Sequence, residues 1–259
     1  MKIAISGKGG VGKTLVAGVL AIFFAGKGLK VLAIDADPSP NLALTLGISP
    51  DEAKKIVPIS ENTQLIESKT KTEYPGVYRL SFSVDDIVKD FSVKSPYDVN
   101  LLIMGTVRSA GTGCLCPANA VVKALLQHLY VERGEVVVMD MEAGVEHLGR
   151  GTAKHVDAML AVTDSSFKAM ETAKKICELA TEMGIKKVFL IGNKVANTNE
   201  GRLIGQFAES NNISLLGLIP YDERIIEADM HGESPTKHAS KSKGIEAIRQ
   251  LGENLILQT

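Results

Sequence analysis

The sequence predicts a single α/β domain with a mostly parallel central sheet and helices on both faces of that sheet. Short apolar runs alternate with longer helix-like stretches along the chain, which is typical of a parallel sheet covered by helices. The 259 residues, 45% of them hydrophobic, are enough for one large core. The intervals between apolar runs are too regular for two separate domains, so we expect residues 1–259 to form one.

Seven apolar runs have the length and the boundaries of strands. In chain order they are Lys2–Ser6, Lys30–Asp35, Val99–Met104, Glu135–Asp140, Asp157–Thr163, Lys186–Gly192 and Ile213–Ile219. Five longer stretches are predicted to be helices: Gly12–Gly28, Pro117–Arg133, Phe167–Gly184, Glu200–Asn211 and Lys243–Leu257.

The segment at about 51–96 interrupts this alternation with charged residues, prolines and polar residues. Within it Tyr78, Leu80, Phe82 and Val84 alternate with polar residues, which is the period of a strand with one buried face. We expect that strand at the edge of the sheet. A surface insertion is the favoured interpretation of the whole segment, and a partner-recognition region is the alternative.

Composition excludes several classes of protein. The formal net charge of −1 argues against a surface built for non-specific nucleic-acid binding. There is no signal-like N-terminal segment, and no apolar run approaches the roughly 18 residues that cross a bilayer. Three cysteines do not make a disulfide framework. We therefore expect a cytoplasmic protein with neither a nucleic acid nor a membrane as partner.

A phosphate-binding loop follows the first strand. Gly7–Thr14 reads GKGGVGKT and fits the template G-x-x-x-x-G-K-[ST] at a strand-to-helix junction. Its glycines let backbone N–H groups curl around phosphate oxygens at the positive end of the following helix. The predicted nucleotide-binding residues are Gly7, Lys8, Gly9, Gly10, Val11, Gly12, Lys13 and Thr14. A plain glycine turn is the alternative, and the complete motif argues against it.

Within this loop Lys13 is predicted to reach the terminal phosphates, while the Thr14 hydroxyl coordinates Mg²⁺. The second strand then ends in D-A-D-P-S-P-N, at the edge where α/β sheets bind ligands. Asp37 is the candidate for activating the attacking water, and Asn41 for supporting the phosphate side. Asp35 is a weaker candidate, a structural neighbour of the loop. The alternative is that both aspartates only cap the next helix.

A second acidic strand end supplies the other metal contact. Asp140 ends the apolar run Val136–Met139, the usual place of a second Mg²⁺ contact. Gly144 follows, where a backbone N–H suits the γ-phosphate. We assign no role to Glu142 or His147.

The identity of the base can be argued from Asn193-Lys194-Val195-Ala196. Guanine-binding proteins of the G-protein type carry N-K-x-D, and here Ala196 stands in place of the aspartate. This favours ATP over GTP. Asn193 and the turn at Pro220 are the residues that we expect to frame adenine.

The three motifs K-G-G-V-G-K-T, D-A-D-P-S-P-N and D-M-E-A-G occur in order along nearly the whole chain. In this the chain resembles the deviant phosphate-loop ATPases, which include MinD, ParA, the nitrogenase iron protein and the arsenical-pump ATPases. The resemblance implies a MinD-like (SIMIBI) fold and an ATPase that alternates between ATP and ADP with Mg²⁺. It also implies that Lys8 reaches across a homodimer to the partner's nucleotide, so that ATP holds two subunits together and hydrolysis loosens them.

Cys114 and Cys116 form a C-x-C pair after a glycine-rich stretch. This spacing can place two sulfurs on one metal, but one chain then offers only two of the four ligands that a thiolate site needs. A two-fold interface would complete the set, for tetrahedral Zn²⁺ or square-planar Ni²⁺. A pair of structural or exposed thiols is the alternative. Cys177 lies on the apolar side of a predicted helix and is expected in the core.

Together with D-M-E-A-G-V-E-H-L-G-R-G, the C-x-C pair resembles the CooC family, ATPases that deliver nickel to carbon monoxide dehydrogenase. The resemblance implies that Cys114 and Cys116 bind the metal between protomers and that Asp37 is the hydrolytic aspartate. It further implies that apo carbon monoxide dehydrogenase is the client. Whether nickel or zinc is the physiological ion stays open, as does the client's assembly.

Two alternatives come from the wider group. One is a reductase resembling the nitrogenase iron protein, with a [4Fe–4S] cluster between subunits, but that family draws its cysteines from well-separated positions. The other is a positioning or partition ATPase of the MinD or ParA type. MinD proteins end in a basic amphipathic helix that seeks membranes. Here Glu246 and Glu253 stand against Arg249, which indicates an ordinary packing helix.

Overall fold

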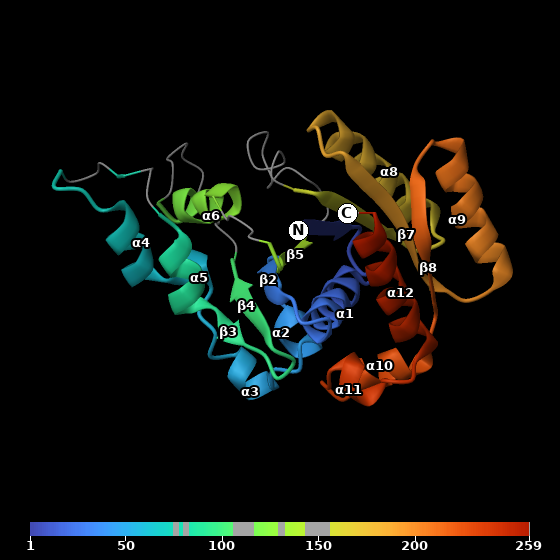
Figure 1. The fold of residues 1–259 in the computed structure, drawn as a ribbon, viewed down its shortest axis with the longest axis horizontal. Helices are drawn as coiled ribbons and strands as arrows, with labels where there is room; N and C mark the ends of the chain where they lie inside the picture. Colours follow the sequence, from blue (N-terminus) through green and yellow to red (C-terminus); the bar gives the residue numbers. More distant parts are fainter. Residues whose placement is uncertain (75–77, 80–82, 106–116, 129–132, 143–155, 259) are drawn as a thin grey trace.

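An eight-stranded sheet runs through the middle of the molecule, with helices on both of its faces (Figure 1). The computed structural model describes residues 1–74, 78–79, 83–105, 117–128, 133–142 and 156–258. The strands lie in the order β3-β4-β2-β5-β1-β6-β7-β8. Their bounds are β1 Lys2–Gly7, β2 Lys30–Ala36, β3 Val93–Lys94, β4 Val99–Ile103, β5 Glu135–Met141, β6 Ala158–Thr163, β7 Lys187–Val195 and β8 Ser214–Pro220. All neighbours pair in parallel except β3, which is antiparallel to β4.

The helices of the described ranges connect these strands. They are α1 Lys13–Gly26, α2 Leu42–Thr45, α3 Pro50–Ala53, α4 Thr63–Thr70, α5 Asp85–Phe91, α6 Pro117–His128, α8 Phe167–Glu182, α9 Thr198–Ser210, α10 Glu223–Met230, α11 Pro235–His238 and α12 Lys243–Leu257, with a 3₁₀ turn at Ile59–Glu61. The seven predicted strands and five predicted helices are confirmed, with ends displaced by a few residues. For the helix predicted at Pro117–Arg133, residues 129–132 lie outside the described ranges.

The core has two layers because β1, at the centre, alternates its side chains between the faces of the sheet. Ile3 and Ile5 pack into the layer that α1, α2 and α12 cover. Ala4 faces the other layer, which receives side chains from α4, α5, α6, α8 and α9. Burial on both sides explains why the central strands read as continuous apolar runs.

The segment at 51–96 forms short helices rather than a long structureless loop. Leu65 of α4 and Ile87 of α5 are buried in the main core, so both helices pack on the domain. The edge strand expected at Tyr78–Val84 is wrong at its two described ends, and Leu80 and Phe82 lie outside the described residues. Tyr78 makes an isolated bridge to Lys71, and Val84 precedes α5. The sheet edge beside β4 belongs instead to β3, because Val93 and Lys94 pair with Leu101 and Asn100.

The C-terminal helix packs as its charge pattern predicts. The Ser242 hydroxyl accepts hydrogen bonds from the backbone N–H groups of Gly244 and Ile245 and so caps the start of α12. The apolar face of α12 is buried against α1 and β8, and α1 lies beside it in Figure 1. Within the ranges that the structure describes, no helix combines the length and apolar character that a bilayer crossing needs.

Candidate nucleotide site

The phosphate-binding loop joins β1 to α1 at the carboxyl edge of the sheet. Gly10 and Gly12 adopt φ angles of +83° and +94°, which side chains rarely tolerate, so the loop needs glycine there. A Cβ at Gly7 would stand 2.3 Å from the carbonyl oxygen of Val162 on β6. The fold therefore fixes the loop at both ends. Gly9 meets nothing within 4 Å of an added Cβ and faces open space.

The two lysines of the loop differ in their surroundings. Lys13, in the first turn of α1, is buried with 7% of its surface exposed. Lys8 is exposed. One cation of the loop is thus buried in the domain, and the other is accessible to solvent.

Asp140 is a buried carboxylate. It is 0% exposed, and within the described part of the chain neither of its oxygens makes a hydrogen bond of ordinary geometry, although the Thr14 hydroxyl lies beside it. Burial raises the pKa of Asp140 to about 7, and the carboxylates of Asp35 and Asp37 raise it further, while the neighbouring Thr14 hydroxyl and Lys13 ammonium lower it. Oxygen atoms of this kind are the ligands that Mg²⁺ prefers. Asp140 and Thr14 therefore fit a divalent cation.

Asp35 organises the turn after β2. One of its carboxylate oxygens accepts from the backbone N–H of Asp37 at 3.1 Å, and the other accepts from Leu42 at the start of α2 at 2.9 Å. Burial raises the pKa of Asp35 to about 6, and the two backbone hydrogen bonds oppose that rise. Asp35 thus caps α2, which is the alternative interpretation given for it above.

Asp37 and Asn41 lie on the turn that Asp35 holds. The half-buried Asp37 carboxylate accepts from the backbone N–H of Ser39 at 2.9 Å through Oδ1. The exposed Asn41 side chain donates to the Ser39 carbonyl oxygen at 2.8 Å. The structure brings Asp37 near Asp140, whose pKa it raises, whereas Asn41 contacts its own turn.

A cavity of about 270 Å³ lies next to the loop, on the side of β7 and β8. Asn193, Pro220 and Tyr221 line it together with Gly12, so the residues expected to frame adenine do meet beside the loop. The side chain of Asn193 donates to the Val11 carbonyl oxygen at 2.7 Å. The cavity is also lined by residues that sequence reasoning missed: Lys194, Asp222, Ile225, Ile226 and Asp229. The side chain of Asp222 accepts from Arg224 N–H and caps α10, a local signal that could have revealed this helix.

Gly144, Cys114 and Cys116 lie outside the described residues. Cys114 and Cys116 belong to residues 106–116 and Gly144 to residues 143–155, and neither range is described. Among the residues that are described, no three His, Cys, Asp or Glu side chains gather as a metal site. The chain enters the segment with the C-x-C pair beside β2, since Met104 N–H donates to the Asp35 carbonyl oxygen at 2.8 Å.

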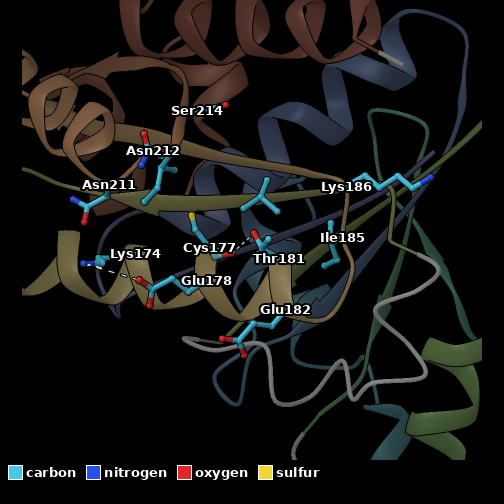
Figure 2. A pocket seen from close by; sticks show the side chains of 12 residues that line it. Lys174, Cys177, Glu178, Thr181, Glu182, Ile185, Lys186, Asn211, Asn212 and Ser214 are labelled. Carbon is cyan, nitrogen blue, oxygen red and sulfur yellow. Dashed lines mark hydrogen bonds and ion pairs between the residues drawn. The ribbon is translucent and has the colours of Figure 1, made fainter.

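A second hollow, of about 450 Å³, lies at the amino-terminal ends of the strands, where β7 and β8 begin (Figure 2). Its wall includes Cys177 of α8, which is 4% exposed and packs in the main core. Burial raises the pKa of this thiol to about 12, so it stays protonated. The expectation that Cys177 belongs to the core is confirmed.

Comparisons with known proteins agree with this geometry. Residues 2–236 match the family model described as the CobQ/CobB/MinD/ParA nucleotide binding domain. The carbon monoxide dehydrogenase accessory protein CooC of Rhodospirillum rubrum is 42% identical over 236 residues, which are 90% of this chain and 89% of CooC. An uncharacterised ATP-binding protein of Methanocaldococcus jannaschii is 41% identical over 251 residues, 96% of each chain. The solved structure of the cell division ATPase MinD of Pyrococcus furiosus is similar in fold, with a TM-score of 0.71 at 21% identity over 100% of this chain and 99% of that one.

A phosphate loop between a central parallel strand and a helix, with acidic residues ending the neighbouring strands, defines a P-loop nucleotide-binding ATPase. The chain belongs to the CobQ/CobB/MinD/ParA family of such proteins, and this membership is consistent with ATP hydrolysis. It is similar to CooC along most of its length.

Proposed function

We propose that this protein is an ATP-hydrolysing metallochaperone that inserts nickel into carbon monoxide dehydrogenase. The observation that carries the proposal is the similarity to CooC, a carbon monoxide dehydrogenase accessory protein, at 42% identity over 90% of the chain. ATP-controlled homodimerisation and a C-x-C metal site shared between two protomers are the finer parts of the proposal.

In the ATPase step, the backbone N–H groups of Gly7–Thr14 bind the phosphates of ATP, and the buried Lys13 neutralises them. Thr14 and Asp140 hold Mg²⁺, which neutralises charge that develops on the phosphate oxygens. Asp37, held by its hydrogen bond from Ser39, orients the attacking water with its carboxylate. Asn193 and Pro220 flank adenine, and the backbone of Gly144 meets the γ-phosphate.

In the dimerisation step, Lys8 contacts the nucleotide of a second copy. Its support is that Lys8 is exposed on the loop while Lys13 fills the inward position. Because Lys13 already neutralises the phosphates bound by its own loop, a second lysine stabilises most by contacting the phosphate of a nucleotide that is bound to another chain. ATP therefore joins the two copies, and hydrolysis removes the phosphate that joins them.

Replacing Lys8 with alanine is expected to leave the fold and ATP binding intact and to abolish ATP-dependent dimerisation. Mass in solution, measured with ATP and with ADP by light scattering, checks this. Lys186→Ala, at an exposed lysine of the hollow where β7 begins, is the control and should dimerise as the natural protein does. A dimer of the Lys8 variant that forms equally well with ATP would refute the cross-subunit role.

In the metal step, each chain contributes Cys114 and Cys116, and two chains complete a four-sulfur site for nickel. Support comes from the point at which the chain passes from β4 into the segment that carries the cysteines. Met104 is hydrogen bonded to the backbone of Asp35, whose carboxylate holds the turn of Asp37. A change in the conformation of that turn on ATP hydrolysis therefore acts on Asp35, through its hydrogen bond on Met104, and along the backbone on the segment with the cysteines.

Nickel is expected to bind at about one ion per two chains, with Cys114→Ser plus Cys116→Ser abolishing the binding. Metal analysis and titration of the protein with and without ATP measure this. Cys177→Ser is the matched control, since that thiol is buried in the core and should leave the stoichiometry unchanged. Stoichiometric nickel retained by the double variant, or bound by a monomer irrespective of nucleotide, would end the proposal.

The same preparation separates the alternatives. Anaerobically isolated protein with a cluster absorption band would favour a reductase that carries a [4Fe–4S] cluster between subunits. ATP-dependent sedimentation with liposomes or DNA would favour a positioning or partition ATPase. We expect neither.

A further inference from the structure

Two consecutive residues near the end of β7 both reach the phosphate-binding loop. Lys194 Nζ donates to the Gly10 carbonyl oxygen at 2.8 Å, and Asn193 Nδ2 donates to the Val11 carbonyl oxygen at 2.7 Å. In a regular strand, neighbouring side chains point to opposite faces of the sheet. Two adjacent side chains therefore reach one loop only where the strand is irregular.

The irregularity is a bulge in the pairing of β7 with β8. Gly192 pairs with Leu218 and Val195 with Pro220, so β7 carries one more residue than β8 over this stretch. Lys194 takes up the extra length in a left-handed conformation, with φ of 58°. That conformation costs on the order of 1 kcal/mol for a residue with a side chain. Bulges of this kind re-aim side chains and occur beside functional sites.

The hydrogen bonds to Gly10 and Val11 set the direction of the loop's peptide groups. In a trans peptide the N–H points away from the C=O of the preceding residue. Holding the Gly10 carbonyl toward Lys194 turns the N–H of Val11 away from Lys194, to the side where the Lys8 carbonyl oxygen accepts from it at 3.3 Å. Likewise, the hydrogen bond that holds the Val11 carbonyl toward Asn193 turns the N–H of Gly12 away from Asn193.

We infer that Lys194 is a positioning residue for the phosphate-binding loop, which it orders before the nucleotide arrives. The inference rests on the proposed ATP site but not on the metal or the client. Without the Lys194 anchor, part of the binding energy of ATP is used to order the loop, and affinity falls. Turnover at saturating ATP depends on Asp37, Asp140 and Lys13, so it should stay within about twofold.

Lys194→Gly is the sharpest test because it removes the anchor and relieves the left-handed strain at the same position. The affinity for Mg-ATP should fall roughly fivefold to tenfold, as for the loss of one exposed hydrogen bond of ordinary strength. The melting temperature should stay within about 3 °C of the natural protein. Lys194→Arg, which keeps a donor at similar reach, should recover part of the affinity.

Asn212→Gly is the matched control. Asn212 also has a positive φ, of 54°, but it lies at the hollow where β8 begins, at the edge away from the loop (Figure 2). This variant should change stability by a similar small amount and leave ATP affinity as it was. A loss of affinity in the control would mean that backbone strain, not the anchor, sets the result.

Inorganic tripolyphosphate separates the loop from the base, because Lys194 also lines the cavity next to Asn193 and Pro220. Calorimetric titration should show the same fold-loss for Mg-tripolyphosphate as for Mg-ATP. A loss confined to ATP would overturn the inference and make Lys194 a contact of the base. Equal ATP affinity in the variant and the natural protein would also overturn it, whereas a natural protein that binds no ATP would instead refute the proposed function.

Discussion

Asp140→Asn is expected to lower Mg²⁺-dependent ATP hydrolysis by roughly a hundredfold or more. The two carboxylate oxygens of Asp140 are buried beside Thr14 and Lys13 and make no hydrogen bond of ordinary geometry to the described residues, and a neutral amide would offer a cation far less. Steady-state turnover over a range of Mg²⁺ concentrations measures the effect. Asp51→Asn, on the exposed side of α3, is the control and should hydrolyse ATP normally. Full activity in the Asp140 variant would remove this residue from the metal site.

The same substitution should stabilise the protein without ligands at neutral and alkaline pH. Because burial raises the pKa of Asp140 to about 7 from 3.8, the folded state holds its proton more tightly than the unfolded state. The stability that this group contributes is complete below about pH 4 and is lost as the pH rises to about 7. At pH 8 the loss amounts to as much as about 4 kcal/mol, and asparagine removes it.

Melting temperatures between pH 4 and pH 8 in a chelating buffer check this sign. The natural protein should lose more stability over that range than Asp140→Asn, and the difference should stop growing above about pH 7. Asp35, whose pKa is raised to about 6, remains in both proteins, and because its charge interacts with Asp140, the difference between the two profiles belongs to the pair of carboxylates. Adding Mg-ATP should give the natural protein the higher melting temperature of the two, since only the natural protein gains binding energy from the metal. If the melting temperatures of the two proteins changed equally with pH, the raised pKa of Asp140 would be contradicted.

Gly12→Ala is expected to have the second large effect, on both stability and ATP affinity. A Cβ there would stand 2.3 Å from Asn193 Nδ2, and φ is +94°, so alanine must change the loop and displace the hydrogen bond from Asn193 to Val11. Left-handed strain and a lost buried hydrogen bond together cost about 3 kcal/mol. That is a fall of roughly 6 to 10 °C in melting temperature.

ATP affinity of Gly12→Ala should fall by about a hundredfold, because peptide groups in a loop that has moved no longer point at the phosphates. Gly26→Ala near the end of α1 is the control, since an added Cβ meets nothing there and φ is not positive. It should bind ATP normally and melt at the same or a slightly higher temperature. Normal affinity in the Gly12 variant would show that the loop does not use its observed shape for binding.

Much of the fold could be predicted because its signals are local. The central strands, buried on both faces, are continuous apolar runs, and helices of about 12 to 16 residues repeat their apolar positions over several turns. Among the described residues, the α-helices missed were α2, α3, α4, α5, α10 and α11, of 4 to 8 residues each, and the two-residue strand β3 and the 3₁₀ turn were missed as well. Helices of one or two turns are too short to show periodicity and form because Leu65, Ile87 or Ala228 is buried against the rest of the chain.

The sequence by itself determined the phosphate loop, since Gly7–Thr14 carries its own backbone requirements, and the sheet with acidic residues at the ends of β2 and β5. It also gave the order of the motifs by which the chain is placed in its family. Only the tertiary structure decided that Asp140 is fully buried beside Thr14 and Lys13 and that Asp35 caps α2. It also decided that a bulge turns Asn193 and Lys194 together onto the loop. The physical reason is that burial, pKa and side-chain direction depend on strands far apart in the chain, which meet only in the folded sheet.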